Sequence, residues 1–139
     1  MEKDPITVEN TVYAPLAKVW EAWTKPEHIM KWAFASDDWE APSAENDLRV
    51  GGRFKTVMAA KDGSAGFDFK GTYTAVKEHE LIEYDMDGDS RHVKVEFSET
   101  SEGVKVIVTF DPENENPIDM QKDGWQAISG NFKKYVESI

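Results

Sequence analysis

The chain has 139 residues, of which 40% are apolar and 12% aromatic, enough to build the core of one domain spanning residues 1–139. Its 27 acidic and 16 basic residues give a net charge of −11, which disfavours binding to nucleic acid or to an anionic membrane. Cysteine is absent, which excludes disulfides, thiol catalysis and cysteine-ligated metal. The start lacks a signal-peptide pattern, and no apolar run approaches the roughly 20 residues of a membrane span, so a soluble cytoplasmic protein is expected.

The N-terminal part predicts one strand followed by a short helix. Residues 6–12 alternate between apolar and polar side chains, and Asn10 is the polar exception in the apolar phase. The next apolar residues recur at helical spacing, with Pro15 in the first turn. They are Leu16, Val19, Trp20 and Trp23.

A corner is predicted directly after this helix. Thr24 is placed to cap a second short helix, Pro26 to occupy its first turn, and Glu27 to complete a capping box. The apolar residues of this second helix would be Ile29, Met30 and Trp32. After Trp39, residues 40–48 are expected to be irregular.

Gly51 and Gly52 are adjacent glycines, so the backbone can adopt conformations here that other residues disfavour. A phosphate-binding loop would need a helix immediately after the glycines, whereas an alternating segment begins at Phe54. We therefore expect the pair to supply positive φ or a bulge where a strand enters the sheet. Arg49 and Arg53 flank the pair; either is placed to reach a ligand carboxylate, but lone arginines more often pair with surface acids.

From residue 54 to residue 110 the apolar period is two, with turns at regular intervals, which predicts an antiparallel meander. The clearest turn signals are Asp62-Gly63 and Asp87-Gly88. The inward phase comprises Phe54, Thr56, Met58, Phe67, Phe69, Gly71, Tyr73, Ala75, Ile82, Tyr84, Met86, Val93, Val95, Phe97, Val104, Val106, Val108 and Phe110.

A helix of about twenty residues is predicted at the C-terminus, with Asn116 as its cap and Pro117 as its first residue. Its apolar stripe consists of Ile118, Trp125, Ile128, Phe132, Val136 and Ile139. Gly124 and Gly130 lie within it, and each costs about 1 kcal/mol of helix propensity relative to alanine. Small residues at such positions favour close packing or a bend.

Three stretches together resemble a known family: residues 14–32 (APLAKVWEAWTKPEHIMKW), 47–54 (DLRVGGRF) and 124–139 (GWQAISGNFKKYVESI). The order of elements is similar to the α+β helix-grip fold of the START-like superfamily. The motifs are similar to its Aha-type domain, named after the activator of the heat-shock chaperone ATPase. The resemblance implies a curved antiparallel sheet of about six to seven strands around the long C-terminal helix, with two short helices after the first strand. The eukaryotic co-chaperone has a further N-terminal domain that does much of the chaperone binding, whereas one domain is expected here.

The leading functional hypothesis is non-catalytic binding of a small, mostly hydrophobic molecule between the sheet and the last helix, without cofactor or metal. The residues expected to line the site are Trp32, Trp39, Phe54, Met58, Phe69, Tyr73, Tyr84, Phe97, Met120 and Trp125. Tyr73 and Tyr84 would orient polar ends of the ligand, and Asn10 and Thr56 share their inward phase. The alternative for each residue taken alone is an ordinary packed core.

Two other functions stay open. The resemblance implies a co-chaperone-like module that binds a heat-shock chaperone and stimulates its ATPase, with acidic loops such as residues 111–116 meeting basic patches. An enzyme similar to the cyclases or hydrolases of the superfamily is the third hypothesis. Its acid or base would be Glu83, Asp68 or His92, although strand phase points all three outward.

Two patterns raise the question of a metal site. Asp85, Asp87, Asp89 and Glu96 match the first, third, fifth and twelfth positions of a calcium loop. The glycine, however, stands at the fourth position instead of the sixth, and strands flank the segment, so a hairpin is the better interpretation. The histidines His28, His79 and His92 lie far apart without helical pairing, which gives little support for zinc.

Overall fold

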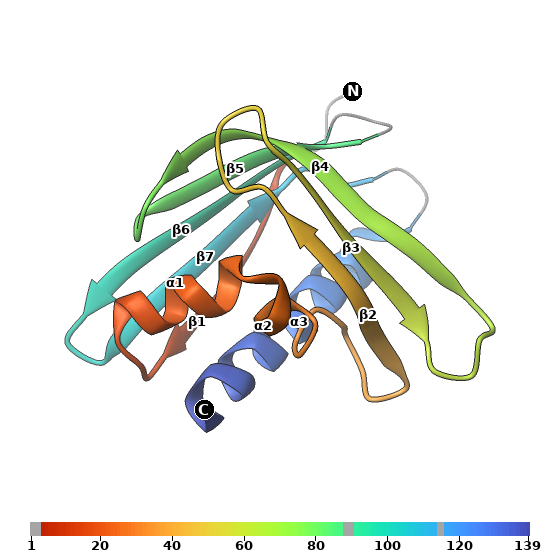
Figure 1. Cartoon of the computed structure of the whole chain (residues 1–139), viewed down its shortest axis with the longest axis horizontal. Coiled ribbons are helices and arrows are strands. Elements are labelled where there is room, and N and C mark those ends of the chain that lie inside the picture. Colours follow the sequence, from red (N-terminus) through yellow and green to blue (C-terminus); the bar gives the residue numbers. More distant parts are fainter. Residues whose placement is uncertain (1–3, 88–90, 114–115) are drawn as a thin grey trace.

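The computed structural model describes residues 4–87, 91–113 and 116–139. Over these residues one seven-stranded antiparallel sheet has the order β1-β7-β6-β5-β4-β3-β2 and curls around a long C-terminal helix (Figure 1). The elements in chain order are β1 (Ile6–Val12), α1 (Leu16–Thr24), α2 (Pro26–Ile29), β2 (Trp39–Asn46), β3 (Arg53–Ala60), β4 (Gly66–Lys77), β5 (Leu81–Met86), β6 (His92–Thr100), β7 (Gly103–Phe110) and α3 (Ile118–Ser138). The predicted α+β helix-grip architecture is confirmed.

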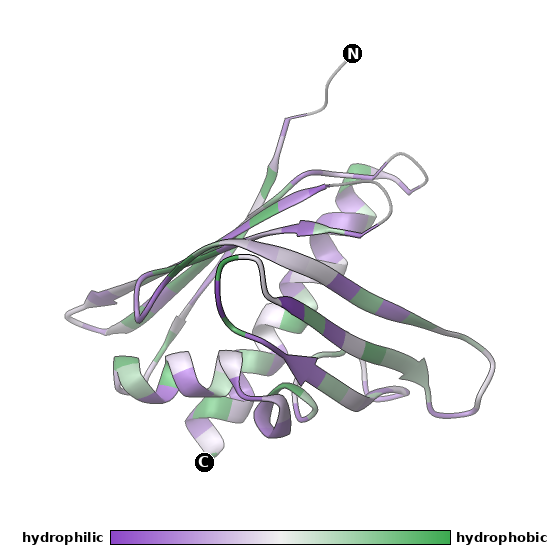
Figure 2. Cartoon of the chain, turned by 45° about the horizontal axis from the view of Figure 1, so that its top comes forward, coloured by the Kyte–Doolittle hydropathy of each residue, from purple (hydrophilic) through white to green (hydrophobic). Residues whose placement is uncertain are grey.

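Strand alternation places the apolar residues on the concave face of the sheet. In β7, Val106 and Val108 are buried, and they pair with Asn10 and Val8 of β1 on one side. Figure 2 shows this pattern as hydrophobic and hydrophilic residues that alternate along the strands. The alternation slips once, because a bulge between Tyr73 and Ala75 brings Val76, instead of the expected Ala75, opposite the buried Ile82.

Helix α3 covers only part of the concave face. It packs mainly against β1 and α1, where Phe132 and Val136 are completely buried. Lys133 Nζ donates to the Thr11 carbonyl at 2.8 Å and fixes the same half of the helix to β1. Strands β2, β3 and β4 curve away on the other side (Figure 1), so the sheet and the N-terminal half of α3 stay apart there.

Residues 39–46 form strand β2, so the expectation of an irregular stretch after Trp39 was wrong. Proline is disfavoured within a sheet because it cannot donate to the ladder. Here β2 is an edge strand that pairs with β3 alone, and the register shifts between Glu40 and Ser43, at Pro42. An edge position with a bulge tolerates the missing amide.

The predicted cap of the second helix was also wrong. Lys25 is the N-cap of α2, without a side-chain hydrogen bond, and no capping box forms. The Thr24 hydroxyl instead donates to the Trp20 carbonyl at 2.9 Å, four residues back, and so completes the end of α1. Helix α2 ends at Ile29, before Met30 and Trp32, although Pro26 does occupy its first position as expected.

Helix α3 begins at Ile118, with Pro117 as N-cap, one residue later than predicted, and Asn116 does not cap it. No described side chain caps the start of α3, but the Gln121 side chain binds the segment that precedes the helix. Its Nε2 donates to the Asn116 carbonyl at 2.8 Å, and its Oε1 accepts from the Glu113 amide at 2.8 Å.

The glycine pair shapes the entry to β3, as predicted. Gly51 has φ +84°, and a Cβ on Gly52 would lie 2.1 Å from the Asp47 carbonyl oxygen. The pair also exchanges backbone hydrogen bonds with Tyr73, at 2.9 Å each. The Asp62-Gly63 turn is confirmed too, with Gly63 at φ +79°. The tip of the other expected hairpin, at Gly88, lies outside the described residues.

The glycines of α3 have a different environment. A Cβ added to Gly124 or Gly130 would meet no described atom within 4 Å. The expectation that they permit close packing was therefore wrong.

Candidate functional site

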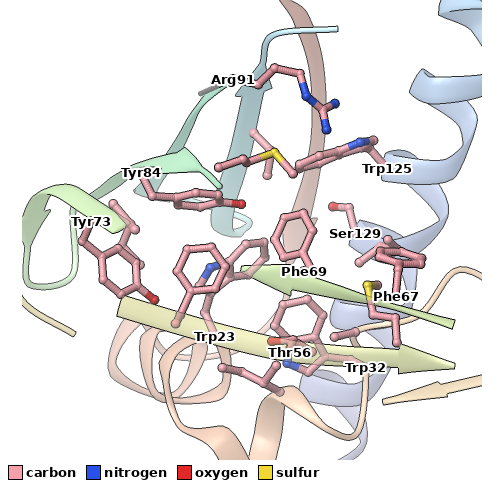
Figure 3. Close-up of a pocket in the computed structure, with 18 of the residues that line it drawn as sticks. Trp23, Trp32, Thr56, Phe67, Phe69, Tyr73, Tyr84, Arg91, Trp125 and Ser129 are labelled. Atoms are coloured by element: carbon pink, nitrogen blue, oxygen red, sulfur yellow. The ribbon is translucent and has the colours of Figure 1, made fainter. Parts of the chain in front are cut away.

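A cavity of about 240 Å³ lies between α3, the α1–α2 corner and strands β3, β4 and β5 (Figure 3). Seven of the ten residues expected to line a site are in its wall. They are Trp32, Phe54, Met58, Phe69, Tyr73, Tyr84 and Trp125. Since the strand residues among them share one phase, the alternation of β3, β4 and β5 brings them to one face of the sheet.

The other three expected residues lie elsewhere. Phe97 is buried and packs edge-on against Trp20 and Trp23, with ring centroids 5.3 and 5.9 Å away. Trp39 lies on the edge strand, 6.0 Å from the Phe67 ring. Met120 is 60% exposed and borders a second hollow that adjoins the first near the start of α3.

Several wall residues were not expected. Trp23, Met86 and Ile128 already belonged to apolar stripes in the sequence, so their periodicity was the available signal. Further wall residues are Ile29, Ala33, Thr56, Phe67, Ile82, Arg91, Val108, Glu113 and Ser129. Arg91 and Glu113 belong to no periodic pattern: Arg91 directly precedes β6, and Glu113 lies in the segment between β7 and α3.

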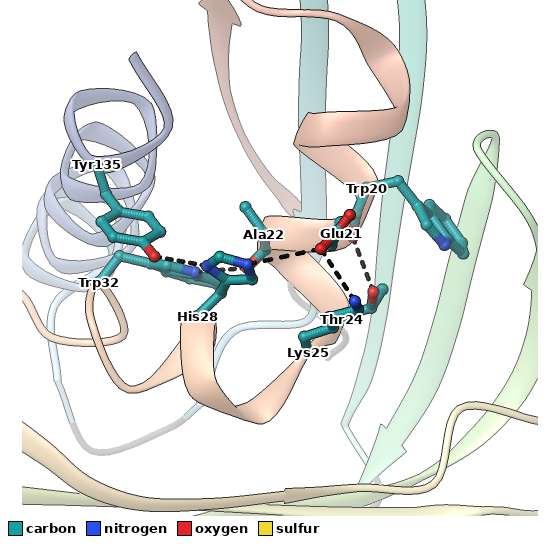
Figure 4. A network of polar contacts seen from close by, with 8 residues as sticks. All are labelled: Trp20, Glu21, Ala22, Thr24, Lys25, His28, Trp32 and Tyr135. Atoms are coloured by element: carbon teal, nitrogen blue, oxygen red, sulfur yellow. Dashed lines mark hydrogen bonds and ion pairs between the residues drawn. The ribbon is translucent and has the colours of Figure 1, made fainter. Parts of the chain in front are cut away.

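The α1–α2 corner fixes the two tryptophans at one end of the cavity. Trp32 Nε1 donates to the Ala22 carbonyl at 2.9 Å, and the Trp23 and Trp32 rings lie 4.8 Å apart. His28 Nδ1 is 2.5 Å from the Tyr135 hydroxyl, which joins the corner to α3 (Figure 4). These contacts hold the corner against the C-terminal half of the helix.

Aromatic rings form the sheet side of the wall. Phe54 is central, with ring centroids 4.7 Å from Tyr84, 5.3 Å from Tyr73 and 5.7 Å from Phe69. It lies directly over Gly71, where an added Cβ would approach its ring to 3.0 Å. The glycine of β4 thus leaves the space that the phenylalanine fills.

The two tyrosines of the cavity differ in their hydrogen bonds. The Tyr73 hydroxyl donates to Asn46 Oδ1 at 2.5 Å, and Asn46 Nδ2 donates to the Thr24 carbonyl at 2.5 Å. The Tyr84 hydroxyl has no hydrogen-bond partner within the described part of the chain. Burial raises the pKa of both phenols, so both are neutral at physiological pH.

Two smaller hydroxyl groups complete the polar lining. Ser129, on α3, accepts a hydrogen bond from Asn10 Nδ2 of β1 at 2.9 Å. Asn10 does not line the cavity itself, but its hydrogen bond orients the hydroxyl of Ser129, which does. Thr56 is 6% exposed and, among the described residues, its hydroxyl has no partner.

The residues considered as acid or base lie on the outer face of the sheet. His92 Nδ1 is 2.7 Å from Asp85 and its Nε2 is 2.8 Å from Glu83. The Asp85 and Glu83 carboxylates raise the pKa of His92, the Asp85 hydrogen bond being the larger cause. Asp68 pairs with Lys55 at 3.7 Å. None of these candidates lines the cavity.

The two arginines beside the glycine pair, and the aspartates of the calcium-like pattern that the structure describes, form ion pairs on the protein surface. Arg49 pairs with Asp47 at 2.9 Å, and Arg53 pairs with Asp87, as lone arginines were expected to do. Asp85 accepts from His92, and Asp89 lies outside the described residues.

Comparisons with known proteins agree with this architecture. The family model described as "Activator of Hsp90 ATPase homolog 1-like protein" matches residues 13–137. The solution structure of an AHSA1-like protein from Aeromonas hydrophila is 45% identical, with a TM-score of 0.90 over 96% of this chain and 92% of that one. A protein from Cytophaga hutchinsonii is 51% identical, with a TM-score of 0.83 over 98% and 94% of the two chains.

A protein from Chromobacterium violaceum shares the fold at 24% identity, with a TM-score of 0.86 over 97% of this chain and 99% of that one. No curated protein matches. Among the described residues, no helix combines the length and the apolar character that crossing a membrane requires.

Proposed function

The chain belongs to the family of Activator of Hsp90 ATPase homolog 1-like proteins, and from this premise we propose that it binds a small, mostly hydrophobic molecule without catalysis. The proposed site is the cavity between α3 and strands β3 to β5, within one START-like domain of residues 1–139. Its aromatic wall offers an apolar ligand several ring faces and edges, and few charged groups reach it.

The observation that carries the proposal is a hollow of this size in so small a protein. A closed, rigid void of about 240 Å³ would cost about 6 kcal/mol at about 24 cal/mol per Å³, and since this cavity is partly open to solvent, that figure is its upper bound. Domains have only about 5–15 kcal/mol of net stability. An occupant that fills the hollow removes much of this cost, and water alone meets few polar partners among the aromatic rings.

A cavity-filling variant tests the site. Ala33 lines the cavity and is 7% exposed, so Ala33→Phe adds a ring inside it. Ala17→Phe, on the exposed side of α1, is the matched control. We expect NMR titration with small aromatic compounds to shift the signals of Phe69, Tyr84 and Trp125 in the wild type and the control. Ala33→Phe should weaken these shifts. Shifts confined to exterior loops would contradict the proposal.

Co-chaperone activity is the second candidate, because the matching family model is described as an activator of a chaperone ATPase. The net charge of −11 would favour a basic surface on such a partner. The test is the ATPase rate of a purified heat-shock chaperone with and without this protein, at low and at physiological salt. Stimulation that falls with salt supports this function, and an unchanged rate removes it.

A further inference from the structure

We infer that the ligand is an uncharged molecule with a flat apolar ring system that presents an oxygen acceptor to the hydroxyls of Tyr84 and Ser129. This inference rests on the proposed binding function and narrows it to a chemical class. It follows from which polar atoms of the cavity are already occupied and which are not.

Tyr84 supplies the first donor. Its side chain is 7% exposed and comes from the centre of the sheet, where β5 pairs with β4 and β6. Its ring is held at 4.7 Å from Phe54 and 6.2 Å from Phe69. In Figure 3 its hydroxyl points into the space between the sheet and α3, and no described residue accepts its proton. Because the hydroxyl faces the cavity instead of being sealed in the core, a ligand oxygen that enters the cavity can accept its hydrogen bond.

Ser129 supplies the second donor from the opposite wall. Because its oxygen accepts from Asn10, its own hydrogen remains to be donated, and Figure 3 shows the oxygen directed toward the cavity. Thr56 adds a third hydroxyl on β3. Tyr73 does not take part, since its hydrogen is already donated to Asn46. The expectation that both tyrosines orient the ligand is thereby narrowed to Tyr84.

The charges of the cavity favour a neutral ligand. Two residues of the lining, Arg91 and Glu113, carry a full charge, and their charges have opposite signs. Each of the two side chains already interacts with other groups of the protein. The rest of the lining consists of neutral side chains, namely aromatic rings, aliphatic and methionine side chains, and the hydroxyls of Thr56, Tyr73, Tyr84 and Ser129. A carboxylate or an ammonium group placed there would be buried without an opposite charge, which is far costlier than burying a neutral oxygen.

Three probes of similar shape separate these features: 2-acetylnaphthalene, 2-ethylnaphthalene and 2-naphthoate. By NMR titration of the full chain, we expect 2-acetylnaphthalene to bind roughly three- to tenfold tighter than 2-ethylnaphthalene, since one hydrogen bond contributes about 0.5–1.5 kcal/mol. The anion 2-naphthoate should bind weakest. Tyr84→Phe keeps the ring and should bring the acetyl-to-ethyl ratio close to one.

Ser129→Ala is the second variant and should lower the same ratio. Tyr13→Phe, which removes a hydroxyl from a side chain 60% exposed on the surface, is the control and should leave it unchanged. A ratio unaffected by both cavity variants, or tightest binding of 2-naphthoate, overturns the inference while the binding function stands. If no probe shifts the signals of the cavity residues, the binding function fails, and this inference with it.

Discussion

The same substitution is expected to have opposite effects at two glycines. In Gly130→Ala the new methyl group meets no described atom within 4 Å, and the position is inside α3. The change should therefore stabilise the protein by about 1 kcal/mol, the difference in helix propensity. This corresponds to an increase in Tm of about 3–5 °C for a domain of this size.

Gly52→Ala should destabilise the protein. Its Cβ would lie 2.1 Å from the Asp47 carbonyl oxygen, and backbone atoms cannot move aside as the end of a flexible side chain can. Shifting the chain costs about 1–3 kcal/mol, as overpacking does elsewhere. The entry to β3 would be displaced, because Gly52 accepts a hydrogen bond from Tyr73 there.

Urea unfolding followed by tryptophan fluorescence, with thermal unfolding by circular dichroism, measures both variants. The two sites share no contact, so the double variant should show the sum of the single effects. A destabilised Gly130→Ala would refute the view that its side is open. A neutral Gly52→Ala would refute the proposed reason for the glycine pair.

Two further predictions concern side chains. Asn46→Ala leaves the buried Tyr73 hydroxyl without its acceptor and should lower the free energy of unfolding by about 1–3 kcal/mol in urea titrations. Ser43→Ala, at an exposed position on the same strand, is the control and should have little effect; equal effects would count against the Tyr73–Asn46 bond. His92 has a raised pKa in the folded state, so its contribution is fully present below the unfolded pKa of about 6.5 and is lost as pH rises through the folded value. Because the group is partly exposed, the effect should be under about 1 kcal/mol, and His92→Gln should abolish this part of the pH dependence.

The sequence predicted the elements that have a clear period. Alternation located β3 to β7, and helical spacing located α1 and α3, because burial of one face leaves a strong pattern. Strand β2 was missed because Pro42 and its polar neighbours suit an edge strand as well as a loop. The predicted caps at Thr24 and Asn116 were wrong because neither α2 nor α3 has a side-chain cap among the described residues; the Thr24 hydroxyl donates back to the Trp20 carbonyl instead.

The polar part of the site was beyond sequence reasoning for a different reason. Ser129 receives its hydrogen bond from Asn10, 119 positions away along the chain, so no local pattern links the two. Tyr73 and Tyr84 are paired neighbours in the sheet and have the same strand phase, so the phase cannot tell them apart. They differ because Asn46 on β2 accepts the hydrogen bond of the Tyr73 hydroxyl. Seven of the 19 wall residues were named from the sequence as site residues, all of them apolar or aromatic, whereas the donors Ser129 and Tyr84 could not be singled out.

The attachment of α3 to one side of the sheet has a consequence for evolution. Phe132 and Val136 secure the helix to β1, whereas the residues that would select a ligand lie mostly on β3, β4 and β5. Wall residues on those strands that also belong to the core, such as Phe54 and Tyr84, limit change in the site, whereas Phe67, which is 53% exposed, can be replaced at less cost to folding. Change in the candidate site can therefore begin at such exposed positions while the half of the helix anchored on β1 stays unchanged.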